Sequence, residues 1–279
     1  MKDPDTLSAI LKAREIIRSL NIENASDIDI EAIAMERGAI VIEGHLKGAD
    51  GRLSVLGSRG LITVKHEIRE FRKKRFIIAH ELGHFELHLS NFLTISCLDS
   101  DFSEWTKTKP FEVEANFFAA ELLMPEIIFR NKIEGKFLSR KLLESLSEEF
   151  QTSLTATSIR FINLRREYAL ICSENGIIKW SVIGNGVPYN FNIRGKLHPD
   201  SIAYDFFNGG SLHNKFFPVS PDAWIDDHRF TINDKIMEMA IPLPIYNQVL
   251  SFLCIDIDEE NDYVKDDYCK ELDGYPKFR

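Results

Sequence analysis

The sequence has few cysteines and no paired arrangement of them, and this scarcity excludes two classes of site. The four cysteines stand at positions 97, 172, 254 and 269. None forms a C-x-x-C pair, which argues against a zinc knuckle or a dithiol redox motif. Their wide spacing predicts free thiols, which are typical of a reducing cytoplasm.

The sequence also lacks long apolar runs and an excess of basic residues. No stretch approaches the ~20 apolar residues that a membrane-spanning helix requires, and the first residues show no signal-peptide pattern. The formal net charge is −9. Because nucleic-acid binding needs clustered Lys and Arg, this balance argues against a protein that binds nucleic acid over its whole surface. We therefore expect a soluble cytoplasmic protein without a membrane partner.

What is present favours a globular α+β protein. Of the 279 residues, 44% are hydrophobic and 28% are charged, enough apolar material for a core in one large or two modest domains. Three short apolar runs within 39–65, with the hairpin signal Asp50-Gly51 between the first two, predict a small antiparallel sheet. Apolar residues at helical spacing predict helices over 4–20, 68–89, 110–123, 138–149 and 155–166. Residues 90–109 are expected to form an irregular connection.

The pattern changes near residue 168. Two apolar runs flank Glu174-Asn175-Gly176, a hairpin signal, and strand-like runs return at 236–241 and 249–255. We therefore predict two domains. Residues 1–167 form the first, with a helix-turn-helix-like pair near 138–166, and residues 168–279 form a β-rich C-terminal domain.

The segment 75–88, RFIIAHELGHFELH, contains the H-E-x-x-H pattern at His80, Glu81 and His84. On a helix, positions i and i+4 lie on one face, so two imidazoles can converge on one cation at ~2.0–2.1 Å. The Glu beside the first His can take a proton from a water on that metal and pass it to a leaving amine. The pattern thus predicts His80 and His84 as metal ligands and Glu81 as the catalytic base.

A third ligand is predicted within 111–120, FEVEANFFAA. Glu112 and Asn116 are four residues apart and share a helix face, so Glu112 can bind the metal while Asn116 orients a metal-bound His. Glu114 is the alternative, but it points away from that face. Two His and one carboxylate suit zinc, with manganese as the alternative, and three protein ligands leave one position for water.

His88 continues the i+4 series but is not favoured as a ligand. His80 and His88 would lie about 12 Å apart along a helix axis, so three convergent His from one straight helix are not expected. We interpret His88 as a structural residue or as a partner of a ligand. The other histidines, at positions 45, 66, 198, 213 and 228, have no ligand-like spacing.

At these residues the chain resembles the ImmA/IrrE family of gluzincin-like metallopeptidases. The resemblance rests on 75–88 and on FEVEANFFAAELLMP at 111–125, with Gly48-Ala-Asp-Gly51 upstream and 149–160 downstream. It implies a zincin-like domain with zinc held by two His and one Glu, here His80, His84 and Glu112, and with Glu81 catalytic. The match departs at Ile77, where a polar residue is common, which should not affect the chemistry.

The resemblance also implies a biological role. Members cleave a helix-turn-helix repressor and so derepress genes of a mobile element or of a stress response. We therefore expect a zinc endopeptidase with a protein substrate, and a sensory role for 168–279 follows by analogy alone. The alternatives are a non-proteolytic regulator that binds DNA or a repressor, and a toxin–antitoxin or phage-defence partner. Basic and acidic residues are nearly balanced within 138–166, so direct DNA contact is not favoured over packing or substrate docking.

Overall fold

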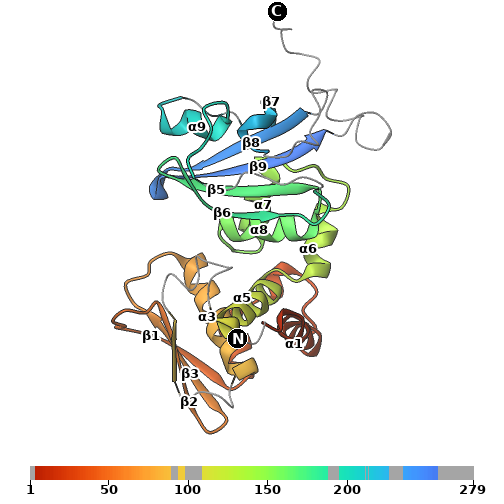
Figure 1. Cartoon of the computed structure of the whole chain (residues 1–279). Helices are drawn as coiled ribbons and strands as arrows, with labels where there is room; N and C mark the ends of the chain where they lie inside the picture. The colour runs from red at the N-terminus through yellow and green to blue at the C-terminus, as the bar shows by residue number, and fades with distance from the viewer. Residues whose placement is uncertain are drawn as a thin grey trace, which may run out of the picture. The chain divides into compact units, whose positions relative to one another are not determined.

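The computed structural model describes residues 4–88, 94–97, 109–187, 195–210, 212, 214–225 and 235–256. The chain divides into two compact units, Met1–Leu164 and Arg165–Arg279, which are described separately below (Figure 1). The first unit mixes helices with a small sheet and the second is rich in strands, so the predicted α+β class is confirmed. Within the residues that the structure describes, no helix is long and apolar enough to cross a membrane.

The first unit holds most of the helices. Its elements are α1 (Thr6–Ser19), η1 (Ala25–Asp27), α2 (Ile30–Glu36), β1 (Ala39–Gly44), β2 (Gly51–Leu56), β3 (Arg59–Lys65), α3 (Phe71–His88), β4 (Thr94–Cys97), α5 (Pro110–Leu123), α6 (Glu126–Ile133), α7 (Arg140–Glu149) and α8 (Leu154–Leu164). Local signals set several of the helix starts. Asp29 caps α2 by accepting hydrogen bonds from two backbone N–H groups, and Pro110 occupies the first turn of α5, as predicted.

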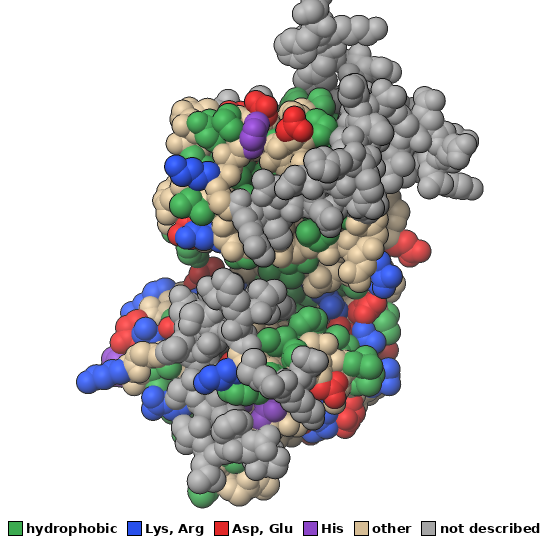
Figure 2. All heavy atoms as spheres, viewed as in Figure 1, with side chains coloured by type: hydrophobic (Ala, Val, Ile, Leu, Met, Phe, Trp, Pro, Cys, Tyr) green, Lys and Arg blue, Asp and Glu red, His purple; other side chains and the backbone are tan. Residues whose placement is uncertain are grey.

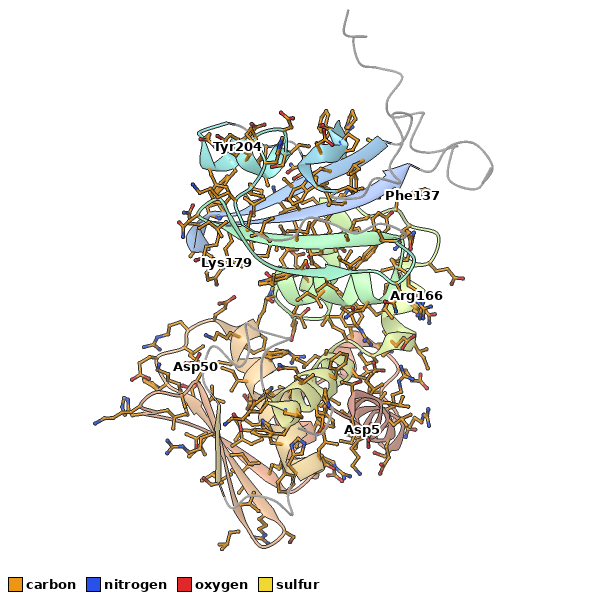
Figure 3. The ribbon with its side chains drawn as sticks, viewed as in Figure 1. Asp5, Asp50, Phe137, Arg166, Lys179 and Tyr204 are labelled. Carbon is orange, nitrogen blue, oxygen red and sulfur yellow. The ribbon has the colours of Figure 1, made fainter. Side chains whose placement is uncertain are left out.

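The sheet of the first unit has the strand order β1-β3-β2-β4. β1 pairs in parallel with β3, whereas β2 is antiparallel to both β3 and β4, so the sheet is mixed rather than antiparallel. The hairpin predicted at Asp50-Gly51 was therefore wrong. Asp50, labelled in Figure 3, is instead buried and forms ion pairs with Lys65 and Lys73. Gly51 begins β2 opposite Val64.

Helix α5 packs against α3 on one side and against α1 on another. The contact with α3 is close because α3 carries a glycine at its centre. A Cβ atom on Gly83 would lie 3.0 Å from Cδ1 of Phe118 and 3.2 Å from Cα of Ala115. Gly83 thus admits the backbone of α5 beside the candidate ligands and sets how near α5 comes to α3.

Helices α7 and α8 lie in the segment near 138–166 for which the sequence predicts a helix-turn-helix-like pair. The turn is held by hydrogen bonds from the Ser147 hydroxyl to the Thr152 carbonyl, 2.8 Å, and between the hydroxyls of Thr152 and Thr157, 2.8 Å. Arg160 on α8 is buried. Its guanidinium donates to the Glu121 carboxylate at 2.5 Å and to the Met124 carbonyl at 3.0 Å.

The second unit is built on one antiparallel sheet with the order β6-β5-β9-β8-β7. Its elements are β5 (Tyr168–Glu174), β6 (Ile177–Ile183), α9 (Ile202–Phe207), β7 (Phe217–Val219), η2 (Pro221–Ala223), β8 (Lys235–Leu243), η3 (Pro244–Tyr246) and β9 (Gln248–Asp256). The predicted hairpin between β5 and β6 is confirmed. Asn175 and Gly176 both have positive φ, 52° and 74°, as a two-residue hairpin turn requires.

One buried carboxylate, that of Glu238, forms hydrogen bonds with several elements of this second unit. Glu238 on β8 is fully buried and accepts hydrogen bonds from the N–H groups of Ile202 and Ala203, at 2.9 and 3.1 Å, at the start of α9. It also accepts from the indole N–H of Trp224 and from the Ser251 hydroxyl, both at 2.9 Å. Four donors therefore satisfy the four acceptor positions of this carboxylate.

Candidate metal centre

The central residues of the candidate site come from one helix, α3. His80 and His84 are four residues apart and lie on the same side of that helix, and both are fully buried. Helix α5 crosses this side and supplies Glu112 from its first turn and Asn116 one turn later. The sequence periodicity of the two helices and their close packing therefore bring these four side chains together.

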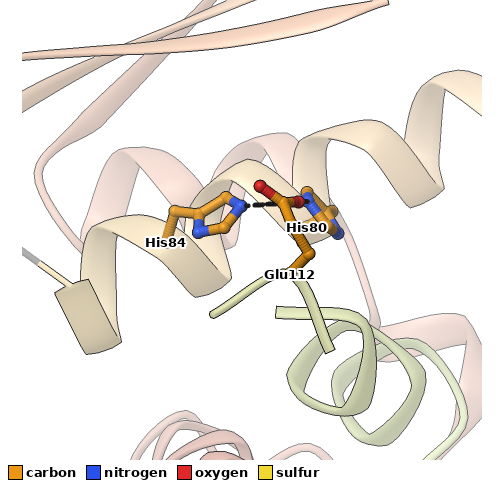
Figure 4. Close-up of side chains that lie close together, drawn as sticks. All are labelled: His80, His84 and Glu112. Atoms are coloured by element: carbon orange, nitrogen blue, oxygen red, sulfur yellow. Dashed lines mark hydrogen bonds and ion pairs between the residues drawn. The ribbon is translucent and has the colours of Figure 1, made fainter. Parts of the chain in front are cut away.

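Three candidate metal-binding atoms lie close together where α5 crosses α3 (Figure 4). The Nε2 atoms of His80 and His84 are 3.0 Å apart, and Oε2 of Glu112 lies 3.0 Å from the first and 3.3 Å from the second. Within the described part of the chain, these residues are the one group of three or more His, Cys, Asp or Glu side chains whose ligand atoms lie within 4.8 Å of one another. The predicted convergence of His80, His84 and Glu112 is observed.

The spacing of these atoms fits a tetrahedral metal ion. Ligand atoms about 2.0–2.1 Å from a zinc ion at tetrahedral angles lie about 3.3 Å from each other. The three separations here, 3.0, 3.0 and 3.3 Å, are close to that value. Two imidazoles and a carboxylate are also a donor set that zinc accepts.

The Nδ1 atom of His80, which is not part of the three-atom group, has a hydrogen-bond partner of its own. That atom lies 2.9 Å from Oδ1 of Asn116, an oxygen that can only accept a hydrogen bond. His80 therefore carries its proton on Nδ1 and turns the lone pair of Nε2 towards His84 and Glu112. This is the arrangement in which an imidazole binds a metal, and it is the role that the sequence predicted for Asn116.

Burial favours the neutral, metal-binding form of His84. Desolvation lowers the pKa of His84 from 6.5 to about 4, so its ring is neutral at neutral pH. The site thus presents, at His84, the neutral imidazole that a metal ion requires.

Glu81 is fully buried on α3 and is packed against the start of β2. A Cβ atom on Gly51 would lie 2.5 Å from Oε1 of Glu81 and 2.6 Å from Cγ2 of Ile77. No other residue would leave this space for the Glu81 carboxylate. Gly51 is a position beside the candidate site that the sequence analysis missed, because Asp50-Gly51 was interpreted as a turn. Its place in the family-like segment 48–51 was the available signal.

The remaining candidates lie outside the three-residue group. Glu114 points elsewhere, as predicted, and its carboxylate contacts His88 rather than the ligand atoms. His45 and His66 are exposed and pair with surface glutamates, and His198 lies beside Asp200. His213 and His228 lie outside the described residues.

Some of the basic side chains of α7 and α8 form ion pairs with glutamates, so fewer of them are available to contact DNA phosphates than the sequence indicates. Arg160 is buried against Glu121, and Arg140 pairs with Glu144 at 2.7 Å. The face drawn in Figure 2 carries described Lys and Arg side chains as well as described Asp and Glu side chains. These pairings support the interpretation of α7 and α8 as packing elements.

Comparisons with known proteins agree with this geometry. Residues 34–161 match the Peptidase_M78 family, described as the IrrE N-terminal-like domain. A solved structure, a Mycobacterium tuberculosis transcriptional regulator, is similar with a TM-score of 0.59 and 16% identity, over 88% of this chain and 76% of that one. No curated protein sequence matches. The resemblance based on the two motifs is thus confirmed, and the match indicates a metallopeptidase-type function. Over residues 34–161 the chain therefore contains an IrrE N-terminal-like domain of the Peptidase_M78 family.

Proposed function

We propose that this chain is a zinc-dependent endopeptidase whose metal is held by His80, His84 and Glu112. The observation that carries the proposal is the buried group of three donor atoms on α3 and α5, at separations that match a tetrahedral site. When bound, zinc supplies a Lewis acid that polarises a peptide carbonyl and makes a water molecule more acidic.

The chain's own residues supply the proton transfers and the orientation. Glu81 follows His80 directly, and its carboxylate accepts the proton of the attacking water and returns it to the leaving amine. The Asn116 amide oxygen holds His80 in the tautomer with a bare Nε2. Packing of Gly51 against Glu81 fixes where that carboxylate lies.

We further propose that the substrate is a helix-turn-helix repressor and that its cleavage derepresses genes in the cytoplasm. The family resemblance supports this substrate class. Within the described residues, the buried Cys172 forms no disulfide, which is typical of a reducing compartment. Residues 168–279 then form an accessory domain, for which a sensory role is the proposal.

The test combines metal analysis with cleavage. The purified full chain is loaded with zinc and incubated with the repressor-like protein encoded beside its gene, and separately with a peptide library read by mass spectrometry. We expect about one zinc per chain and cleavage that stops when a chelator is added. Glu81→Gln should keep the metal and lose cleavage, and Glu112→Ala should lose the metal.

Three results would overturn the proposal. A wild-type chain that binds no zinc, or that binds zinc and cuts neither the repressor nor the library, is not the proposed peptidase. If Glu81→Gln still regulates the target promoter in cells as the wild type does, the non-proteolytic alternative is correct, with α7 and α8 as the surface to examine in a gel-shift experiment.

A further inference from the structure

A chain of hydrogen bonds leads away from the second candidate ligand. Nδ1 of His84 lies 3.0 Å from Nδ1 of His88, one helical turn along α3, and Nε2 of His88 lies 2.7 Å from Oε2 of Glu114 on α5. The other oxygen of that carboxylate, Oε1, accepts a hydrogen bond of 2.8 Å from the backbone N–H of Asp5, which caps α1. Asp5 is labelled in Figure 3.

The donors and acceptors along this chain allow one assignment for neutral rings. An ionised carboxylate can only accept, so Nε2 of His88 carries a proton and donates it to Glu114. Nδ1 of a neutral His88 then has a lone pair, and it accepts a hydrogen bond from Nδ1–H of His84. Nε2 of His84 is left bare, facing His80 and Glu112 at 3.0 and 3.3 Å.

Burial makes this assignment costly to change. His84 is fully buried and His88 is 5% exposed, so neither ring can exchange its partner for bulk water without a loss. The ring of Phe111 lies beside both imidazoles, with centroids 5.9 and 6.2 Å away. The contact between His88 and Glu114 is short, as expected for a hydrogen bond to an ionised acceptor.

From this geometry we propose that Glu114, acting through His88, is the positioning residue of His84. The inference rests on the proposed function, because the orientation matters only if His84 binds a metal. Helix α5 would then supply three parts of the site: the ligand Glu112, the partner Asn116 for His80, and the carboxylate of Glu114 that orients His84 through His88. This arrangement gives a role to two residues, His88 and Glu114, that fail as ligands.

The proposal predicts a defect in metal binding that a conservative variant repairs. Zinc dissociation constants are measured by competition with a chromophoric chelator, at one pH, for the full-length chain. His88→Phe keeps a ring of similar size without nitrogens and should weaken zinc binding about 10- to 100-fold, the usual loss when a partner of a ligand is removed. His88→Asn should restore binding to within about threefold of wild type, because its amide oxygen stands near the position of Nδ1 and can accept from His84.

A matched control separates this effect from the loss of any ion pair on α3. Glu86 lies on the same helix and pairs with Arg37 at 2.7 and 3.0 Å, and it is not part of the hydrogen-bond chain. Glu86→Gln should leave the zinc dissociation constant within about twofold of wild type, whereas Glu114→Ala should weaken binding about tenfold.

The tautomers give a second readout that does not depend on activity. Long-range 15N–1H spectra of the metal-free and zinc-loaded chain should show protons on Nδ1 of His84 and on Nε2 of His88. A folded His88→Phe with wild-type zinc affinity, or a proton on Nε2 of His84 in the metal-free chain, would overturn the proposal. If His88→Phe does not fold, Glu114→Ala and these spectra still decide it. A wild-type chain that binds no zinc refutes the proposed function instead, and the spectra keep the two failures distinct.

Discussion

The close packing of Gly51 against Glu81 allows the role of Glu81 to be tested without changing Glu81 itself. A Cβ atom at position 51 would lie 2.5 Å from Oε1 of Glu81 and 2.6 Å from a methyl group of Ile77. Gly51 does not have a positive φ, so Gly51→Ala introduces crowding and no backbone strain. The three nearest atoms belong to Glu81 and Ile77 and none to a predicted ligand.

The expected size of the effect follows from these distances. Ordinary contacts between non-bonded atoms begin near 3.5 Å, so the Glu81 carboxylate must move by about 1 Å. A displacement of about 1 Å in a catalytic group costs roughly 100-fold in rate. Crowding of this kind costs about 1–3 kcal/mol of folding free energy, partly offset by about 0.5–1 kcal/mol gained when Ala replaces Gly in a strand.

The assay compares three quantities for the same protein preparation: zinc content, unfolding free energy and the rate of peptide-library cleavage. Gly51→Ala should keep its zinc, lose about 1–2 kcal/mol of stability and lose about 99% of its cleavage rate. Gly60→Ala is the control. Gly60 lies in the same sheet as Gly51, and a Cβ atom there would lie 3.0 Å from the Phe85 ring, with no Glu81 atom among its three nearest neighbours. A Gly51→Ala protein that cleaves as fast as Gly60→Ala would refute this account of Glu81.

Three further predictions follow from buried polar groups. Asn116→Ala removes the acceptor of His80 Nδ1 and should weaken zinc binding about tenfold, measured by chelator competition; unchanged affinity would show that this bond does not orient the ring. In the metal-free protein the pKa of His84 is lowered from 6.5 to about 4, so the unfolded chain binds this proton more readily between those values and stability should fall as the pH falls through that window. Urea unfolding at about pH 7 and about pH 5 should show a loss of roughly 2 kcal/mol that His84→Gln lacks, and an equal loss in both proteins would contradict it. Glu238→Leu leaves four buried donors without their acceptor and should cost about 3 kcal/mol or more, whereas Glu238→Gln, which keeps one oxygen, should cost less; equal thermal midpoints for the two variants would exclude this role.

Features with a local cause were predicted correctly from the sequence. The i, i+4 spacing of His80 and His84 needs only a helix, and Pro110 at the first turn of α5 needs only its fixed φ. The turn at Asn175-Gly176 likewise follows from residues that accept a positive φ. In each case, interactions within a few residues decide the conformation.

Tertiary contacts decided what the local pattern could not. The Asp50-Gly51 pair has the composition of a hairpin turn, yet β1 pairs in parallel with β3, and Gly51 is needed for its missing Cβ beside Glu81. The bond between His88 and Glu114 joins residues 26 positions apart and has no periodic signature in the sequence. By itself, then, the sequence determined which side chains share a helix face. Only the packing of α5 against α3, made close by Gly83, decided which atoms of the two helices meet, because that contact depends on shape and burial over the whole unit.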